Sequence, residues 1–159
     1  MDKKQIIGGD FEIESSFENF SIQSQRLVKY QRGAWTLSGR SALSILIDKL
    51  KRRGVNHIHL PAFLCHSILQ VVKESGIYYS FYPVNLDLKA LPDPPPKSAT
   101  LLIHYFGFLN DSTNDLRKSD VINKNLIEDA SHIFLSNSYY NEENIQFVFF
   151  SARKFAPIF

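Results

Sequence analysis

Three short segments carry side chains that could do chemistry together. Ser38-Gly39-Arg40-Ser41 offers backbone N–H groups, a guanidinium and hydroxyls, which suit a phosphate. Glu128-Asp129-Ala130-Ser131-His132 offers a carboxylate and an imidazole, and Ser151-Ala152-Arg153-Lys154 offers an amine. Taken singly, these segments are typical of helix capping, a surface ion pair and a solvated lysine. Only their combination, a phosphate cradle with a carboxylate and an amine, indicates a functional site.

The first of these segments opens a predicted helix. Apolar residues recur at spacings of one, three and four along the sequence that follows Gly39, at Ala42, Leu43, Leu46, Ile47 and Leu50. Basic residues crowd the far end, and Gly54 follows them. The pattern therefore predicts a helix that begins at Ser38-Gly39, with free backbone N–H groups there, and stops before Gly54.

The remaining segments alternate between strand and helix patterns. We expect strands at 57–60, 77–84, 99–106, 125–128 and 146–150 and a helix at 64–75. Residues 111–120 predict a polar helix or turn, and residues 91–96 an extended proline-rich connection. Near-continuous apolar runs such as Leu101-Leu102-Ile103 and Phe147-Val148-Phe149-Phe150 are typical of parallel strands covered on both faces. The sequence thus predicts an α/β domain with a mostly parallel sheet and helices on both faces.

The predicted sheet brings the three chemical segments to one edge. Ligands of open parallel sheets gather outside the carboxyl ends of the strands, and anions prefer helix N-termini. One segment opens a helix and the other two follow strands. We therefore expect Gly39, Asp129 and Lys154 to meet at this edge.

Composition excludes several classes of protein. The 159 residues are 44% hydrophobic and 21% charged, which is typical of one globular domain rather than a disordered chain. A formal charge of +2 is too small for a nucleic-acid footprint. Cys65 is the single cysteine, and no apolar run is long enough for a membrane span or a secretory signal. We expect a cytoplasmic protein that binds neither nucleic acid nor a membrane.

The order of the motifs resembles the DegT-like (DegT/StrS) sugar aminotransferases, which are pyridoxal-phosphate enzymes of fold type I. The resemblance covers most of the chain, from about Gly8 to Phe159, and its most specific elements are the acidic strand end and the lysine about 25 residues later. The matching segments are Ser38-Gly39-Arg40-Ser41-Ala42-Leu43, Leu60-Pro61-Ala62-Phe63-Leu64-Cys65, His104-Tyr105-Phe106-Gly107, Leu126-Ile127-Glu128-Asp129-Ala130-Ser131-His132 and Phe150-Ser151-Ala152-Arg153-Lys154.

This resemblance implies roles for individual residues. Lys154 would be the amine that joins the cofactor and later moves the substrate proton, and Asp129 would pair with the protonated ring nitrogen, with His132 nearby. The phosphate would be held by Gly39, Arg40 and Ser41, with Ser151 as a further donor. Family members carry an aromatic ring that stacks on the cofactor near the position of Cys65, and Phe63 is the candidate for that ring here.

The resemblance also implies what the whole protein does. It implies an aminotransferase that works as a homodimer and moves an amino group from a donor, usually glutamate, to a keto sugar attached to a nucleotide. Family members are more than twice as long, so we expect residues 1–37 to form an N-terminal arm and residues 38–159 to be a truncated part of the large cofactor-binding domain.

Three other interpretations remain open from the residues alone. A truncated chain could be a catalytically silent module that acts by binding a partner through uncovered apolar surface. His57 and His59 alternate on a strand, but without a third ligand they are more typical of structural histidines. The aromatic segment Tyr78-Tyr79-Ser80-Phe81-Tyr82 is more typical of a sheet core or a dimer surface than of a platform for nucleic-acid bases.

Overall fold

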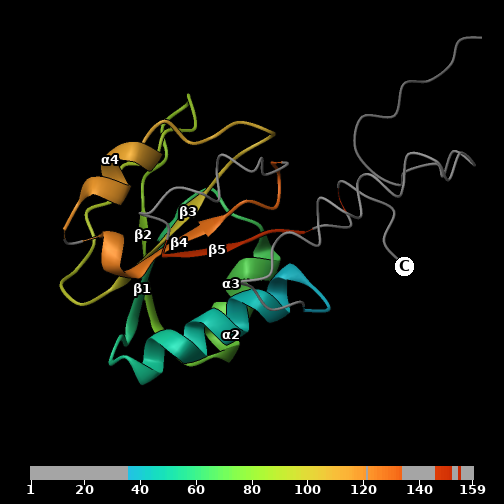
Figure 1. Cartoon of the computed structure of the whole chain (residues 1–159), viewed down its shortest axis with the longest axis vertical. Helices are drawn as coiled ribbons and strands as arrows, with labels where there is room; N and C mark the ends of the chain where they lie inside the picture. Colours follow the sequence, from blue (N-terminus) through green and yellow to red (C-terminus); the bar gives the residue numbers. More distant parts are fainter. Residues whose placement is uncertain (1–35, 121, 134–145, 152–153, 155–159) are drawn as a thin grey trace, which may run out of the picture.

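One parallel sheet of five strands organises the chain (Figure 1). The computed structural model describes residues 36–120, 122–133, 146–151 and 154. The strands lie in the order β2-β1-β3-β4-β5, and every neighbouring pair is parallel. Their bounds are β1 His57–Pro61, β2 Tyr78–Tyr82, β3 Ala99–Ile103, β4 Leu126–Asp129 and β5 Phe147–Phe149.

Helices cover both faces of the sheet (Figure 1). The helices α2 (Gly39–Arg52) and α3 (His66–Glu74) pack against each other on one face, and α2 also contacts β5. On the opposite face lie α4 (Thr113–Lys118) and the short 3-10 helix η2 (Asn123–Asn125). The predicted α/β architecture is confirmed: the sheet is entirely parallel and helices lie on both of its sides.

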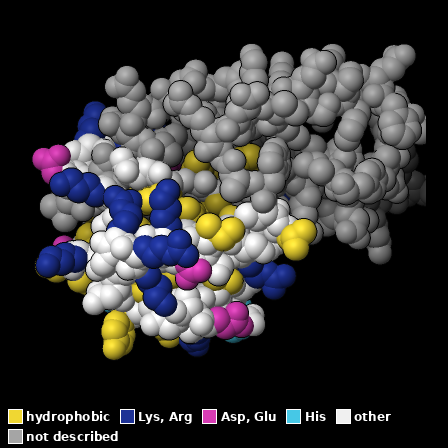
Figure 2. Space-filling model, turned by 60° about the horizontal axis from the view of Figure 1, so that its bottom comes forward, with side chains coloured by type: hydrophobic (Ala, Val, Ile, Leu, Met, Phe, Trp, Pro, Cys, Tyr) yellow, Lys and Arg dark blue, Asp and Glu magenta, His cyan; other side chains and the backbone are white. Residues whose placement is uncertain are grey.

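The ends of α2 follow the signals in its sequence. Ser38 is in an extended conformation, and its hydroxyl accepts a hydrogen bond from the N–H of Ser41 at 3.2 Å, as an N-cap does. At the other end the chain leaves the helix at Gly54, whose φ of +82° lies in the left-handed region that favours glycine. Basic side chains of the last turn gather on the surface over this helix (Figure 2). One of them, Lys51, donates to the C=O of Ser75 just beyond α3 at 2.8 Å.

The core divides between the two faces because successive strand residues point to opposite sides. Residues such as Leu101, Ile103 and Ile127 pack against α2 and α3. Their strand neighbours Leu102 and Leu126 instead form a smaller cluster beneath α4. Glu128 and Asp129, at the end of β4, therefore lie on opposite faces as well.

The direction of α2 brings its N-terminus to the carboxyl edge of the sheet. A Cβ atom on Gly39 would lie 3.7 Å from the ring of Phe149, the last residue of β5. At the opposite end of α2, Lys49 and Arg53 lie over the ring of Phe147, where β5 begins. The helix thus runs antiparallel to the strands. Within the described residues, no helix has the length and apolar character needed to cross a membrane.

Candidate functional site

The N-terminus of α2 meets the ends of β4 and β5. Gly39 lies close to both, since a Cβ atom there would be 3.8 Å from the hydroxyl of Ser131 and 3.7 Å from Phe149. Ser38 caps the N–H of Ser41, whereas no described residue accepts from the N–H groups of Gly39 and Arg40. The first turn of a helix carries a partial positive charge. This corner of the fold is therefore suited to an anionic group.

Asp129 ends β4 beside that corner. Its side chain is buried, and one carboxylate oxygen, Oδ1, accepts the N–H of Ser131 at 2.9 Å. Among the described residues no donor forms a hydrogen bond with the other oxygen, Oδ2. The backbone C=O of Asp129 accepts the N–H of His104 at 3.1 Å. The carboxylate is thus fixed in place with one oxygen open to a ligand.

His132 lies against an aromatic ring and near two charged groups. Its imidazole is stacked on the ring of Phe106, with centroids 6.0 Å apart and an interplanar angle of 15°. Partial burial lowers the pKa of His132, and the nearby ammonium of Lys154 lowers it further, whereas the carboxylate of Asp129 opposes the shift. Both charged groups therefore act on this imidazole.

Cys65 lies within electrostatic reach of the same two charged groups. Its thiol is exposed, with Sγ 3.2 Å from the hydroxyl of Ser67 at the start of α3. Hydrogen bonds from the Ser67 hydroxyl and from its backbone N–H lower the pKa of Cys65, burial opposes this, and Lys154 lowers the pKa further. Lys154 is thus within electrostatic reach of residues that follow β1 and β4.

Tyr105 forms the wall next to Asp129. Its phenol donates to the backbone C=O of Phe63 at 2.5 Å, and the two rings lie 5.4 Å apart. Burial, and then the neighbouring charge of Asp129, raise the pKa of Tyr105 to about 12. The phenol is therefore a permanent donor at neutral pH, and it joins the segment after β1 to the segment after β3.

A buried ionic network supports the site from the opposite face of the sheet. Arg117 on α4 holds the carboxylate of Glu128 in a fork, with Nε 2.8 Å from Oε1 and Nη2 2.9 Å from Oε2. His104 completes it, with Nε2 3.0 Å from Oε2 of Glu128. The Nδ1 atom of His104 accepts the N–H of Asn110 at 3.2 Å, so Nε2 carries the proton that faces Glu128. The network ties α4 to β4 and to both ends of the loop 105–109.

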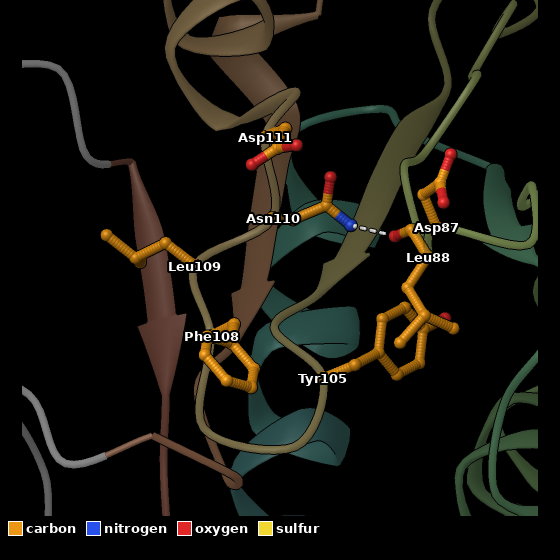
Figure 3. A pocket seen from close by; sticks show the side chains of 7 residues that line it. All are labelled: Asp87, Leu88, Tyr105, Phe108, Leu109, Asn110 and Asp111. Carbon is orange, nitrogen blue, oxygen red and sulfur yellow. Dashed lines mark hydrogen bonds between the residues drawn. The ribbon is translucent and has the colours of Figure 1, made fainter.

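A pocket of about 120 Å³ opens beside Tyr105 (Figure 3). Phe108 and Leu109 form one side, and Leu88 and Tyr105 face them from the other (Figure 3). Asn110 joins the two loops, since its amide donates to the C=O of Leu88 at 2.9 Å. None of the residues that the sequence analysis singled out as site residues lines this pocket, which is completed by Asp87 and Asp111.

The structure brings together most of the predicted site residues. Gly39, Asp129, His132, Cys65 and Lys154 all lie at the carboxyl edge, linked by the contacts and charge effects above. Ser151 is half-buried there, and its C=O accepts the N–H of Lys154 at 3.1 Å. Ser41 is half-buried in the first turn of α2, where its N–H donates to the hydroxyl of Ser38. The remaining two predicted side chains are more peripheral: Arg40 is exposed, and the ring of Phe63 is half exposed and packs on Tyr105 and Phe106.

Sequence reasoning missed two features of the site. It gave no role to Tyr105 and Phe106, although two aromatic residues directly after a buried strand are a signal that this edge is lined by rings. It also did not find the partners of Glu128. His104 is buried and bonded to Glu128 and Asn110, and among the described residues no three His, Cys, Asp or Glu side chains are grouped as a metal site.

Comparison with known proteins does not identify the chain. No protein-family model matches it, and no curated protein matches it. Any functional assignment therefore depends on the residues and on the geometry of the carboxyl edge.

Proposed function

We propose that the chain binds pyridoxal phosphate at the carboxyl edge of the sheet, as part of an aminotransferase that acts on a keto sugar nucleotide. One observation carries this proposal: Asp129 and Lys154 both act on the pKa of His132 and of Cys65. A carboxylate and an imidazole from the segment after β4, a thiol from the segment after β1 and an amine from the segment after β5 thus lie within electrostatic reach of one another at the carboxyl edge. The sugar nucleotide, the glutamate donor and the homodimer come from the family resemblance.

The phosphate end of the cofactor fits the start of α2. The N–H groups of Gly39 and Arg40 have no acceptor among the described residues, and the helix dipole favours an anion there. Gly39 leaves room, because a side chain at this position would fill the space next to Ser131 and Phe149. The hydroxyls of Ser41 and Ser131 lie at the same corner and are further donors.

The ring nitrogen of the cofactor fits Asp129. A protonated pyridine nitrogen needs a carboxylate partner, and Oδ2 of Asp129 has no hydrogen bond within the described part of the chain. The N–H of Ser131 holds Oδ1 and so orients the carboxylate. The buried position limits competition from water, which strengthens such a pair.

Lys154 supplies the amine. Its side chain is exposed, and its backbone N–H is held by the C=O of Ser151 at 3.1 Å. When bound, pyridoxal phosphate supplies an electron-withdrawing ring that stabilises a negative charge on the substrate carbon. The task of Lys154 is to hold and return the proton of that carbon, and the imidazole of His132 is placed to orient the ligand beside Asp129.

The test is a titration of the full chain with pyridoxal phosphate, followed by borohydride reduction and peptide mass mapping. We expect a visible absorbance band and a reduced cofactor attached to Lys154. Lys154→Ala should abolish both, whereas Lys73→Ala, which removes an exposed lysine in the last turn of α3, should change neither. Asp129→Asn retains an acceptor for Ser131 and should weaken binding at least about tenfold, the loss expected for one charge-assisted hydrogen bond.

Attachment spread over surface lysines, or the absence of the band in a folded sample, would contradict the proposal. The second of these results would favour the silent, partner-binding module instead. If the cofactor binds, release of 2-oxoglutarate from glutamate by the loaded chain tests the amino donor.

A further inference from the structure

The outermost strand, β2, presents an unusual edge. It pairs with β1 on one side and is the last strand of the described sheet on the other (Figure 1). Its five residues, Tyr78-Tyr79-Ser80-Phe81-Tyr82, carry no charge and no proline. Exposed edges in natural sheets are normally protected by lysine, proline or a bulge. The strand β2 has none of these devices within its own length.

The backbone of β2 offers hydrogen-bonding groups to the outside. The N–H of Tyr78 donates to the C=O of Asn56, and the C=O of Tyr82 accepts the N–H of Ala62. The backbone N–H and C=O groups of the even-numbered residues of β2 therefore point towards β1. The N–H and C=O groups of Tyr79 and Phe81 point outward, since alternate residues of a parallel strand bond to opposite sides. No described residue pairs with them.

This open edge has defined ends. Before it, the N–H of Ile77 donates to the hydroxyl of Ser75 at 3.3 Å. After it, the C=O of Pro83 accepts the N–H of Leu91 at 3.3 Å, so the segment at Leu91 occupies the outer side of Pro83. An added strand therefore has room only from Ile77 to Phe81.

The side chains of the edge are aromatic and exposed. Tyr78 is 73% exposed, Tyr79 36% and Phe81 47%, and the rings of Tyr79 and Phe81 lie edge to face at 5.6 Å. Only Tyr82 belongs to the core. The sequence left two interpretations of this segment open, a sheet core and a dimer surface. The sheet-core interpretation therefore applies to Tyr82 alone.

We propose that β2 pairs with β2 of a second copy of the chain, antiparallel and about a two-fold axis at Tyr79. In this register Tyr79 faces Tyr79 of the second copy, and Phe81 faces Ile77. Four hydrogen bonds form: two between the Tyr79 residues, and one from each Phe81 N–H to the opposite Ile77 C=O. An axis at Ser80 would place Ile77 opposite Pro83, where Leu91 already lies.

A second copy suits this edge better than a charged partner does. A two-fold axis brings each residue of β2 close to the same residue of the second copy. Because β2 carries no charge, this pairing causes no repulsion between like charges. The exposed aromatic surface is modest: three partly exposed rings from each copy remove at most roughly 600 Å² from water. Because stable interfaces bury about 1,200 Å² or more, we expect a weak dimer that dissociates on dilution.

Sedimentation of the full chain from about 1 to 200 µM tests the proposal. We expect a concentration-dependent monomer–dimer equilibrium. Phe81→Lys should weaken it at least about tenfold, because it removes two cross-strand contacts and protects the edge. Phe108→Lys is the matched control, since it changes an exposed phenylalanine in the loop 105–109 and should leave the equilibrium unchanged. A chain that stays monomeric, or open-ended aggregation, would overturn the proposal, as would equal weakening by the two variants.

A cross-link tests the register even if Phe81→Lys does not fold. In a Cys65→Ser background, Tyr79→Cys should form a disulfide-linked dimer on mild oxidation, because residues that face each other in such a pair have Cα atoms about 5.5 Å apart. Tyr78→Cys should not, because its two copies are offset along the strands beyond the reach of a disulfide. Equal linking of the two variants would refute the register. The outcome is independent of cofactor binding.

Discussion

Replacing Glu128 with alanine should lower the free energy of unfolding by about 3–5 kcal/mol, the usual cost of removing one partner of a buried ion pair. Both of its oxygens are engaged, at 2.8 and 2.9 Å by Arg117 and at 3.0 Å by His104. Arg117 is only 4% exposed, so water cannot replace the lost carboxylate without a local opening. Domains of this kind are stabilised by about 5–15 kcal/mol, so this loss is a large fraction of the total.

Urea unfolding of the full chain, followed by far-ultraviolet circular dichroism, measures this loss. Glu128→Gln keeps the volume of the side chain, removes its charge and replaces one acceptor oxygen with an NH2 donor, so it separates the loss of the ion pair from the cavity that alanine leaves. The matched control is Glu74→Ala, which removes an exposed glutamate of α3 whose carboxylate accepts from Gln70 at 2.8 Å. An exposed pair at this spacing contributes about 0.5 kcal/mol or less.

A double variant tests whether the loss comes from the pair. Replacing both members of a buried ion pair with apolar residues is often close to neutral, because no charge remains buried. Glu128→Leu with Arg117→Met should therefore be more stable than Glu128→Ala alone. The reasoning is refuted if Glu128→Ala costs less than about 1 kcal/mol, or if the double variant is as unstable as the sum of its single changes.

Two further predictions concern titratable groups at the carboxyl edge. Tyr105 has a native pKa of about 12 against about 10 in an unfolded chain, so its neutral form stabilises the fold fully below pH 10, and this contribution disappears as the pH rises towards 12. Stability between pH 10 and 12 should therefore fall more steeply for the wild-type chain than for Tyr105→Phe in urea unfolding, and equal slopes would contradict the assignment. Hydrogen bonds from Ser67 lower the pKa of Cys65, so Ser67→Ala should raise it and slow the alkylation of Cys65 by iodoacetamide at pH 7.5. An unchanged alkylation rate would show that Ser67 does not act on the thiol.

The fold could be predicted because its signals are local. Apolar spacing, a serine at the start and a glycine at the end are enough to define α2, and the observed bounds differ from the expected ones by at most a few residues. Apolar runs that are buried on both sides likewise identify β3, in which every residue is buried. The parallel arrangement then follows from the alternation of strands and helices.

The candidate site was predictable only as a set of residues at one edge. The sequence indicates that Asp129 and Lys154 follow strands, but the partners of each side chain depend on the register between strands. In β3 and β4, Ile103 lies beside Asp129, and this register is what brings the N–H of His104 to the C=O of Asp129. The stacking of Phe106 on His132 depends on the same register and on a loop whose path has no local signal.

Arg117 shows why a polar pattern can mislead. The segment 111–120 predicts a polar helix or turn, and α4 does occupy Thr113–Lys118. An arginine in such a segment is normally solvated, yet Arg117 is buried because it reaches Glu128 on the covered face of β4. Its carboxylate partner lies eleven residues further along the chain, and only the tertiary structure joins them.

Glu128 and Asp129 are adjacent in sequence but serve opposite faces of the sheet. Because side chains alternate along a strand, the first carboxylate turns into the ionic network with Arg117 and the second turns towards α2. The network includes His104, whose backbone N–H holds the C=O of Asp129. The ion pair between Glu128 and Arg117 therefore stabilises the domain and, through His104, also holds the Asp129 carboxylate in position. A substitution at Glu128 should affect both the stability of the domain and the position of Asp129.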